Sequence, residues 1–225
     1  MPRPYRLDDR LRRHDLVHIT RHSWRSMLAS SGDLATDPLL AHWLDNGWPL
    51  VARRPGPGEE HGVPLALSLP PWAQRRRLAF LVQPEQIVSV SPPPTLAAAG
   101  LVAPRSWWLT LDRLAALAAR HALDIRVFGS LGWNSITGLD YLTDHSDLDL
   151  AMQMRANTDV LAVIAALHTL ESQAPMRLDG ELIRPDGAAV GWRELHTGAP
   201  EVLLKSLDGA ALIQRHLFIQ GELPC

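Results

Sequence analysis

The segment Ser146-Asp147-Leu148-Asp149-Leu150 constrains the fold more than any other stretch, because charged and apolar residues alternate in it with a period of two. In a β-strand, successive side chains point to opposite faces, so both leucines reach a core while both aspartates share the other face. Two carboxylates about 7 Å apart along a strand repel each other in an empty site. A divalent cation removes that repulsion, and Mg²⁺ prefers oxygen ligands from carboxylates, water and phosphates. The pattern predicts a strand with a metal site on one face, although a solvated edge strand shows the same alternation.

Two neighbouring segments favour the metal site over the edge strand. Upstream, Phe128-Gly129-Ser130 ends a predicted strand, where a glycine lets the backbone approach a phosphate and the serine hydroxyl can hold its oxygens. An ordinary Gly-Ser turn would look the same. Downstream, Asp179 and Glu181 lie in the next predicted strand, and either could reach the same site if the two strands are neighbours. The alternative is an exposed acid on an amphipathic strand.

Proline- and glycine-rich stretches at 55–71 and 91–104 indicate a domain boundary near residue 95. We expect an N-terminal α+β domain over 1–95, with a helix around 34–45 and strands at 47–54, 63–68 and 77–82. We expect a larger domain over 96–225 with a mixed sheet and helices. Its predicted helices run from a Thr110 cap to His121, over 158–170 and from Pro200 to Ile219; its strands are 125–128, 147–152, 176–183 and 188–193.

Charge and composition exclude several classes of protein. The net charge is 22 − 24 = −2, which argues against a histone-like nucleic-acid binder. There is no run of about 18 apolar residues and no signal-peptide pattern in the charged N-terminal segment, so we expect a cytoplasmic protein that binds no membrane. The only cysteine is Cys225, which excludes a disulfide framework within one chain and a cysteine-based zinc site.

Cationic residues are mostly arginines, and they are unevenly distributed. Residues 1–100 carry 12 Arg and 9 acids, a net of 12 − 9 = +3, and include Arg75-Arg76-Arg77 and Arg53-Arg54. This cluster could dock an acidic protein or phosphates, or it could be a solvated face. Lys205 is the only lysine of the chain. We expect it near the start of a helix, either as a point charge for a phosphate chain or as a solvated side chain.

The order of these elements resembles the nucleotidyltransferase superfamily of the polymerase β type: a strand, Gly129-Ser130, a linker, Asp147-x-Asp149 and a further acid on the next strand. The string F-G-S-L-G-W-N-S-I-T-G-L-D-Y-L-T-D-H-S-D-L-D-L, residues 128–150, resembles the malonate decarboxylase holo-acyl-carrier-protein synthases, also called phosphoribosyl-dephospho-coenzyme A transferases. The segments L-D-G-E-L (178–182), A-V-G-W-R-E-L (189–195), V-L-L-K-S-L (202–207), R-H-D-L-V (13–17) and G-W-P-L-V-A-R-R (47–54) are similar to the same family.

This resemblance implies a reaction. Such enzymes transfer a 2′-(5″-phosphoribosyl)-3′-dephospho-coenzyme A group from its triphosphoribosyl donor to a serine of the apo acyl carrier protein subunit of malonate decarboxylase, and pyrophosphate leaves. The implied fold is a C-terminal nucleotidyltransferase domain preceded by the smaller α+β domain. The implied cofactor is Mg²⁺ or Mn²⁺, which suits attack by a hydroxyl on a phosphorus.

The predicted site residues follow from the residues and the resemblance together. Asp147 and Asp149 are the predicted metal ligands and catalytic acids, with Asp179 as the third carboxylate, a ligand or a base, and Glu181 in reserve.

Gly129, Ser130 and Lys205 are predicted to bind the donor's phosphates. Trp133 and Tyr141 could wall the pocket or stack on adenine, or they could pack in the core.

Two alternatives remain open from the sequence. The same fold could serve another acceptor, such as the citrate lyase carrier protein, a small molecule, another protein hydroxyl or a nucleic acid end, the last being the least expected. The chain could also be an inactive nucleotidyltransferase-like binding module, but the presence of all three acids argues against that.

Overall fold

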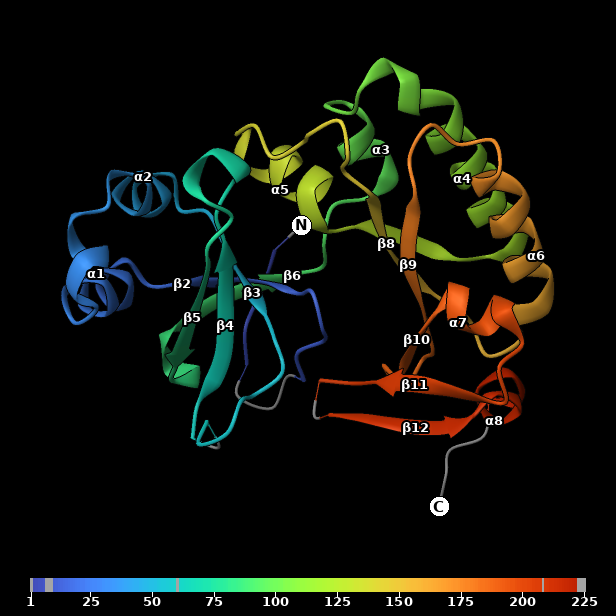
Figure 1. Cartoon of the computed structure of the whole chain (residues 1–225). Helices are drawn as coiled ribbons and strands as arrows, with labels where there is room; N and C mark the ends of the chain where they lie inside the picture. The colour runs from blue at the N-terminus through green and yellow to red at the C-terminus, as the bar shows by residue number, and fades with distance from the viewer. Residues whose placement is uncertain (1, 7–9, 60, 208, 222–225) are drawn as a thin grey trace. The chain divides into compact units, whose positions relative to one another are not determined.

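The computed structural model describes the chain except residues 1, 7–9, 60, 208 and 222–225. The chain divides into two compact units, Met1–Pro93 and Pro94–Cys225 (Figure 1). Each unit combines helices with one six-stranded sheet of described residues, which confirms the expected α+β class. None of the helices formed by the described residues has the length and apolar character needed to cross a membrane.

The N-terminal unit contains an antiparallel sheet with the strand order β1-β6-β2-β3-β4-β5. Its strands are β1 (Arg3–Pro4), β2 (Leu16–Ile19), β3 (Leu50–Ala52), β4 (Val63–Ser68), β5 (Arg77–Val82) and β6 (Ile87–Ser91). Its helices are α1 (Arg21–Ala29) and α2 (Pro38–Asn46), with short 3₁₀ turns at Gly32–Thr36, Pro71–Ala73 and Pro84–Gln86. The predicted strands 63–68 and 77–82 are confirmed at their full length. The predicted helix 34–45 is interrupted because Asp37 ends the 3₁₀ turn and caps α2, where its side chain accepts from the Leu39 N–H at 2.9 Å.

The C-terminal unit contains a sheet with the order β12-β11-β10-β9-β8-β7; among its described strands, β8 and β9 pair in parallel and the other neighbours pair antiparallel. Its strands are β7 (Asp124–Val127), β8 (Leu148–Gln153), β9 (Leu178–Ile183), β10 (Ala189–Gly191), β11 (Glu201–Lys205) and β12 (Ala210–Gln214). Its helices are α3 (Leu96–Gly100), α4 (Trp108–His121), α5 (Gly129–Thr137), α6 (Val160–Glu171), α7 (Trp192–Thr197) and α8 (Arg215–Gln220), with a 3₁₀ turn at Arg105–Trp107.

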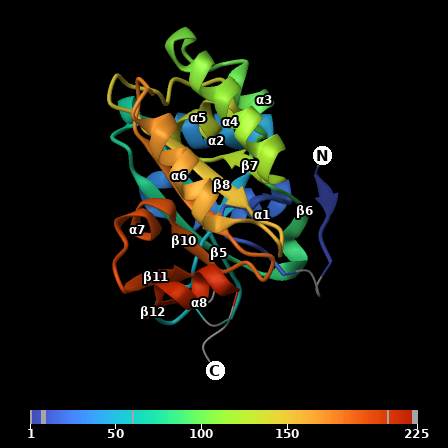
Figure 2. The ribbon, with the colours of Figure 1, turned by 90° about the vertical axis from the view of Figure 1, so that its right-hand side faces the viewer.

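The core of this unit lies between one face of the sheet and the helices α4 and α6, which stand in front of the sheet in Figure 2. Leu148, Leu150 and Met152 of β8 are fully buried in this core, as are Leu178 and Leu182 of β9. The even-numbered residues of both strands therefore face the helices, as the alternating pattern predicts. The odd-numbered residues, which include the acids, are left for the opposite face, on the side where Figure 1 shows α5.

Three sequence predictions in this unit are wrong. The predicted helix from Pro200 to Ile219 is the hairpin β11–β12 followed by the short helix α8, because Val202 pairs with Ile213 and both side chains are buried. Thr110 does not cap α4: the helix follows directly from a 3₁₀ turn and Thr110 lies buried within it. The predicted strand 188–193 ends at Gly191, where the chain turns into α7.

Candidate active site

The acids on β8 and β9 are brought together by the only parallel pairing among the described strands of this sheet. In the register of that pair, Asp149 stands opposite Asp179 and Leu148 opposite Leu178. Because side chains of register partners share a face, the two aspartate side chains leave neighbouring strands on the same side of the sheet, and the strands lie about 4.8 Å apart. Asp147 lies two residues before Asp149, and Glu181 two residues after Asp179, on the same face. The condition set by the sequence, that the two strands be neighbours, is therefore met.

The Gly129-Ser130 bend lies directly against Asp149. Gly129 begins α5 with a left-handed φ of +61°, and a Cβ placed on it would overlap Oδ2 of Asp149. The Ser130 backbone N–H donates a hydrogen bond to the Asp149 carboxylate, and the Phe128 N–H donates to the Asp149 backbone carbonyl at 3.1 Å. The residue before the helix, Phe128, has no side chain that can accept a hydrogen bond from the first N–H groups of α5. The carboxylate of Asp149 accepts one of these hydrogen bonds instead. A glycine is required here for two reasons, its φ and the closeness of the carboxylate.

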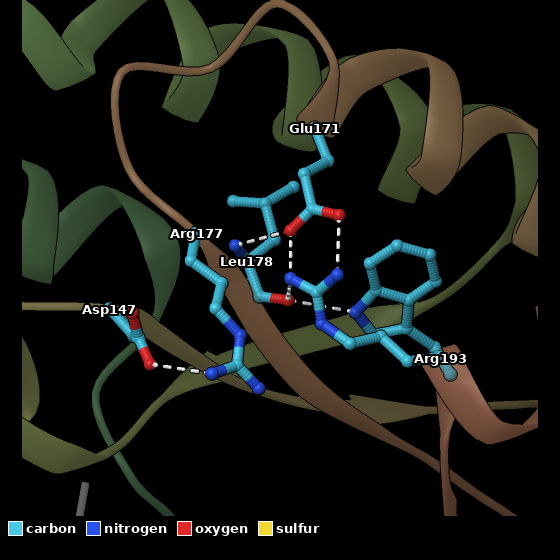
Figure 3. A network of polar contacts seen from close by, with 6 residues as sticks. Asp147, Glu171, Arg177, Leu178 and Arg193 are labelled. Atoms are coloured by element: carbon cyan, nitrogen blue, oxygen red, sulfur yellow. Dashed lines mark hydrogen bonds and ion pairs between the residues drawn. The ribbon is translucent and has the colours of Figure 1, made fainter.

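Electrostatic repulsion is concentrated on Asp149. Burial, and after it the negative charges of Asp179 and Asp147, raise the pKa of its carboxyl to about 7. The Ser130 N–H and the positive charge of Arg177 act against this rise in pKa. Arg177 Nη1 lies 3.7 Å from Asp147 Oδ2, an ion pair that is largely open to solvent (Figure 3). The site therefore holds more negative charge than its neighbouring cations neutralise.

Lys205 lies on β11 and not near the start of a helix, so its expected position is corrected. Its Nζ lies 3.2 Å from Oε1 of Glu181, whose side chain is buried. The ion pair neutralises Glu181 and leaves Asp179 as the acid that adds uncompensated charge to Asp149. Of the two candidates for a third carboxylate, the geometry favours Asp179.

The carboxylates of this site are oxygen ligands of the kind that a divalent metal ion binds. Among the residues that the structure describes, no three His, Cys, Asp or Glu side chains gather closely enough to form a metal cage. Mg²⁺ commonly binds one or two carboxylates and completes its shell with water and substrate phosphates. The neighbouring carboxylates of Asp147 and Asp149, with the repulsion that raises the Asp149 pKa, are of this kind. The residues fit a two-carboxylate site for Mg²⁺ or Mn²⁺.

Sequence reasoning missed three charged residues around this site: Arg177, Glu171 and Arg193. Arg177 could have been found, because it lies two residues before Asp179 and so belongs to the same strand face. Glu171 and Arg193 pair with each other across 22 residues of sequence, and no local pattern links them.

The two aromatic residues expected to wall the pocket or pack in the core do the latter. The rings of Trp133 and Tyr141 are both buried and stack at 6.3 Å between centroids, and burial raises the pKa of the Tyr141 hydroxyl.

The chain was compared with known proteins. Residues 95–216 match the family described as "Phosphoribosyl-dephospho-CoA transferase MdcG C-terminal domain", and residues 12–93 match the corresponding N-terminal domain. A phosphoribosyl-dephospho-CoA transferase of Bradyrhizobium diazoefficiens is 52% identical over 93% of this chain and 92% of its own. Proteins of the same name are 37% identical in Xanthomonas campestris (79% of this chain, 84% of the relative) and 32% identical in Azotobacter vinelandii (80% and 85%). No solved structure matches the chain. With both halves and nearly the whole length matched, the chain belongs to the phosphoribosyl-dephospho-CoA transferase family, as its resemblance implies.

Proposed function

We propose that this protein transfers the 2′-(5″-phosphoribosyl)-3′-dephospho-coenzyme A group from its triphosphoribosyl donor to a serine of the apo acyl carrier protein subunit of malonate decarboxylase, with release of pyrophosphate. The relatives' name supports the transferred group. The single observation that carries the chemistry is the pair Asp149 and Asp179, set side by side on parallel strands against the Gly129 bend. This arrangement suits phosphoryl transfer, in which the protein supplies position and charge more than covalent chemistry.

The proposed reaction is a substitution at the α-phosphorus of the donor. The serine hydroxyl oxygen of the carrier forms a bond to the α-phosphorus of the donor, and the bond from that phosphorus to the bridging oxygen of the pyrophosphate breaks. The pyrophosphate leaves with the electron pair, and the product is a phosphodiester. The hydroxyl proton passes to a carboxylate, for which we assign Asp179, since Glu181 is held by Lys205.

Asp147 and Asp149 are assigned as ligands of the metal ion. When bound, Mg²⁺ or Mn²⁺ would neutralise charge on the phosphates and on the departing pyrophosphate. The residues themselves prepare this site, because the first turn of α5 holds the half-buried Asp149 carboxylate through the Ser130 N–H.

The residues next to the acids, Gly129, Ser130 and Lys205, are assigned to bind the donor's phosphates. The Ser130 N–H is taken by Asp149, so we assign the Ser130 hydroxyl to the phosphates, while Gly129 lets the bend lie close to the acids. Lys205 supplies a positive charge at the other end of the row of acids, next to Glu181.

A turn in the N-terminal unit supports an acidic protein as the acceptor. Trp72 is 61% exposed, and Arg75 and Arg77 follow it with exposed guanidinium groups that have no partner among the described residues. Within the turn, Arg75 adopts a left-handed φ of 49°, and Arg76 forms an ion pair with Asp37 at 2.7 Å. An exposed tryptophan beside free arginines is typical of protein contact surfaces, and the positive charge favours an acidic partner.

The test is a transfer assay with the full chain, Mg²⁺, the triphosphoribosyl donor and the apo carrier protein, followed by intact mass measurement of the carrier. The proposal expects the carrier to gain the mass of the phosphoribosyl-dephospho-coenzyme A group, and expects no gain when Mg²⁺ is chelated. An unmodified malonate decarboxylase carrier, together with a modified citrate lyase carrier or small molecule, would reassign the acceptor. Absence of transfer to every acceptor and absence of Mg²⁺ binding would point to an inactive binding module.

A further inference from the structure

The strand that carries Asp179 loses its outer partner close to that residue. β10 pairs with β9 only from Ile183 back to Glu181, because the chain turns into α7 after Gly191. On the inner side, pairing with β8 continues to Leu178. An unpaired strand edge leaves backbone N–H and C=O groups that must find other partners. Leu178, the residue directly before Asp179, lies on this unpaired stretch.

Side chains from two helices take the place of the missing strand (Figure 3). The Leu178 N–H donates to Oε1 of Glu171 at 2.9 Å, and Glu171 is the last residue of α6. The Leu178 carbonyl accepts from Nε1 of Trp192 at 2.9 Å and from Nη2 of Arg193 at 3.1 Å, both at the start of α7. Both backbone groups of this one residue are therefore satisfied by side chains. We call Glu171, Trp192 and Arg193 the edge clamp.

The members of the edge clamp also hold one another. Arg193 donates from both terminal nitrogens to Glu171, with Nη1 to Oε2 at 2.6 Å and Nη2 to Oε1. The guanidinium lies over the Trp192 ring at 4.8 Å from its centroid, and Trp192 is almost fully buried. A forked ion pair that also stacks on a ring has one preferred geometry. The clamp is therefore a rigid support between α6, α7 and β9.

We propose that the edge clamp is a positioning device that fixes Asp179 beside Asp149, an inference that rests on the proposed function of these acids. Backbone groups on both edges of β9 are hydrogen-bonded just before Asp179. On the inner edge, the Arg177 carbonyl accepts from the Leu148 N–H at 2.9 Å. On the outer edge, the Leu178 N–H donates to Glu171 of the edge clamp. Strand β9 is thus held on both edges where the acids meet. A misplacement of about 1 Å can cost about 10²-fold in rate, so loss of the clamp affects turnover more than substrate binding.

The chain offers a matched control for this proposal. Glu194 of α7 makes the same kind of contact on another strand, since its Oε2 accepts from the Leu203 N–H on β11 at 2.9 Å. Both glutamates tie a backbone N–H of the same sheet, but only Glu171 ties the residue next to Asp179. Comparing Glu171→Gln with Glu194→Gln separates a positioning role from a general loosening of the sheet.

The experiment measures amide hydrogen exchange and steady-state kinetics on the full chain, with the apo carrier and the triphosphoribosyl donor as substrates. We expect Glu171→Gln to speed exchange at the Leu178 amide by about tenfold or more and to lower kcat by at least about tenfold, with both KM values within about twofold of wild type. We expect Glu194→Gln to speed exchange at Leu203 and to leave kcat within about twofold. If Glu171→Gln fails to fold, Arg193→Lys takes its place, because it keeps the charge but loses the fork.

Two results would overturn the proposal: faster exchange at Leu178 with an unchanged kcat, or equal losses of kcat in the Glu171 and Glu194 variants. Asp179→Asn, measured alongside, separates this failure from failure of the proposed function. Wild-type turnover in Asp179→Asn would refute the role of that acid, while the exchange rates would still decide whether the clamp holds β9.

Discussion

Replacement of Gly129 by alanine tests the close packing on which the candidate site depends. Two effects are expected to lower the free energy of unfolding of this variant. A non-glycine residue at a φ of +61° is strained by about 1–2 kcal/mol. The new Cβ would also overlap Oδ2 of Asp149 and push its carboxylate off the Ser130 N–H, a hydrogen bond to a charged group worth about 1.5–3 kcal/mol. We therefore expect Gly129→Ala to lower the free energy of unfolding by about 2.5–5 kcal/mol.

Gly138 provides the matched control at the other end of the same helix. Its φ is +70°, and a Cβ built there meets nothing within 4 Å, so Gly138→Ala carries the backbone strain without the overlap. We expect it to cost about 1–2 kcal/mol and to retain turnover. Chemical denaturation and the transfer assay measure both variants, and turnover of Gly129→Ala is expected to fall at least about 100-fold because Asp149 is displaced.

A double-mutant cycle identifies the cause of the loss. In an Asp149→Ala background the overlapping oxygen is gone, so the cost of Gly129→Ala should fall towards that of Gly138→Ala. Equal destabilisation by Gly129→Ala and Gly138→Ala in the wild-type background, with turnover retained in both, would refute the reasoning that Gly129 makes room for the Asp149 carboxylate.

Three further predictions concern charge. Asp147→Ala should lower turnover in the transfer assay by several orders of magnitude without lowering the melting temperature, since this acid faces the site and not the core; a wild-type rate would contradict its role. The pKa of the Asp149 carboxyl is 3.8 in the unfolded chain and about 7 in the folded one. Between these two pH values the folded state therefore binds more protons than the unfolded state. Without metal, we expect the free energy of unfolding to fall as the pH rises from about 4 to 7. Asp149→Asn should remove this part of the pH dependence in melting curves recorded with EDTA, and an unchanged dependence would show that another group causes it. Arg75→Ala should raise the KM for the carrier at low salt and leave kcat unchanged; a wild-type KM under those conditions would exclude this turn as the docking surface.

Local patterns in the sequence predict a structural feature correctly where that feature belongs to a single strand or turn. The alternation from Asp147 to Leu150 predicts a strand with leucines in the core, and Leu148 and Leu150 are fully buried there. The period of two is a property of one strand and needs no partner. The bend at Gly129 could be predicted for the same reason, since its glycine and its place after a strand are local features.

Predictions failed where distant residues decide the structure. Pro200 is an acceptable first residue of a helix, but Val202 pairs with Ile213 and the segment becomes a hairpin. The prediction that Lys205 lies near the start of a helix is wrong for the same reason, since the residue lies on β11. Its partner in the ion pair, Glu181, is 24 residues away in the sequence. Helical propensity is a weak preference that strand pairing and burial readily override.

The sequence by itself determined the α+β class, the strand that follows Asp147 and carries Asp149, and the family to which the chain belongs, because each of these rests on residues that are adjacent or closely spaced. Only the tertiary structure decided that Asp179 stands opposite Asp149, that Lys205 neutralises Glu181, and that Glu171 and Arg193 hold the edge of β9. These contacts depend on the register of strands and on helices far apart in the chain. Register is set by burial across the whole sheet, which no short segment encodes.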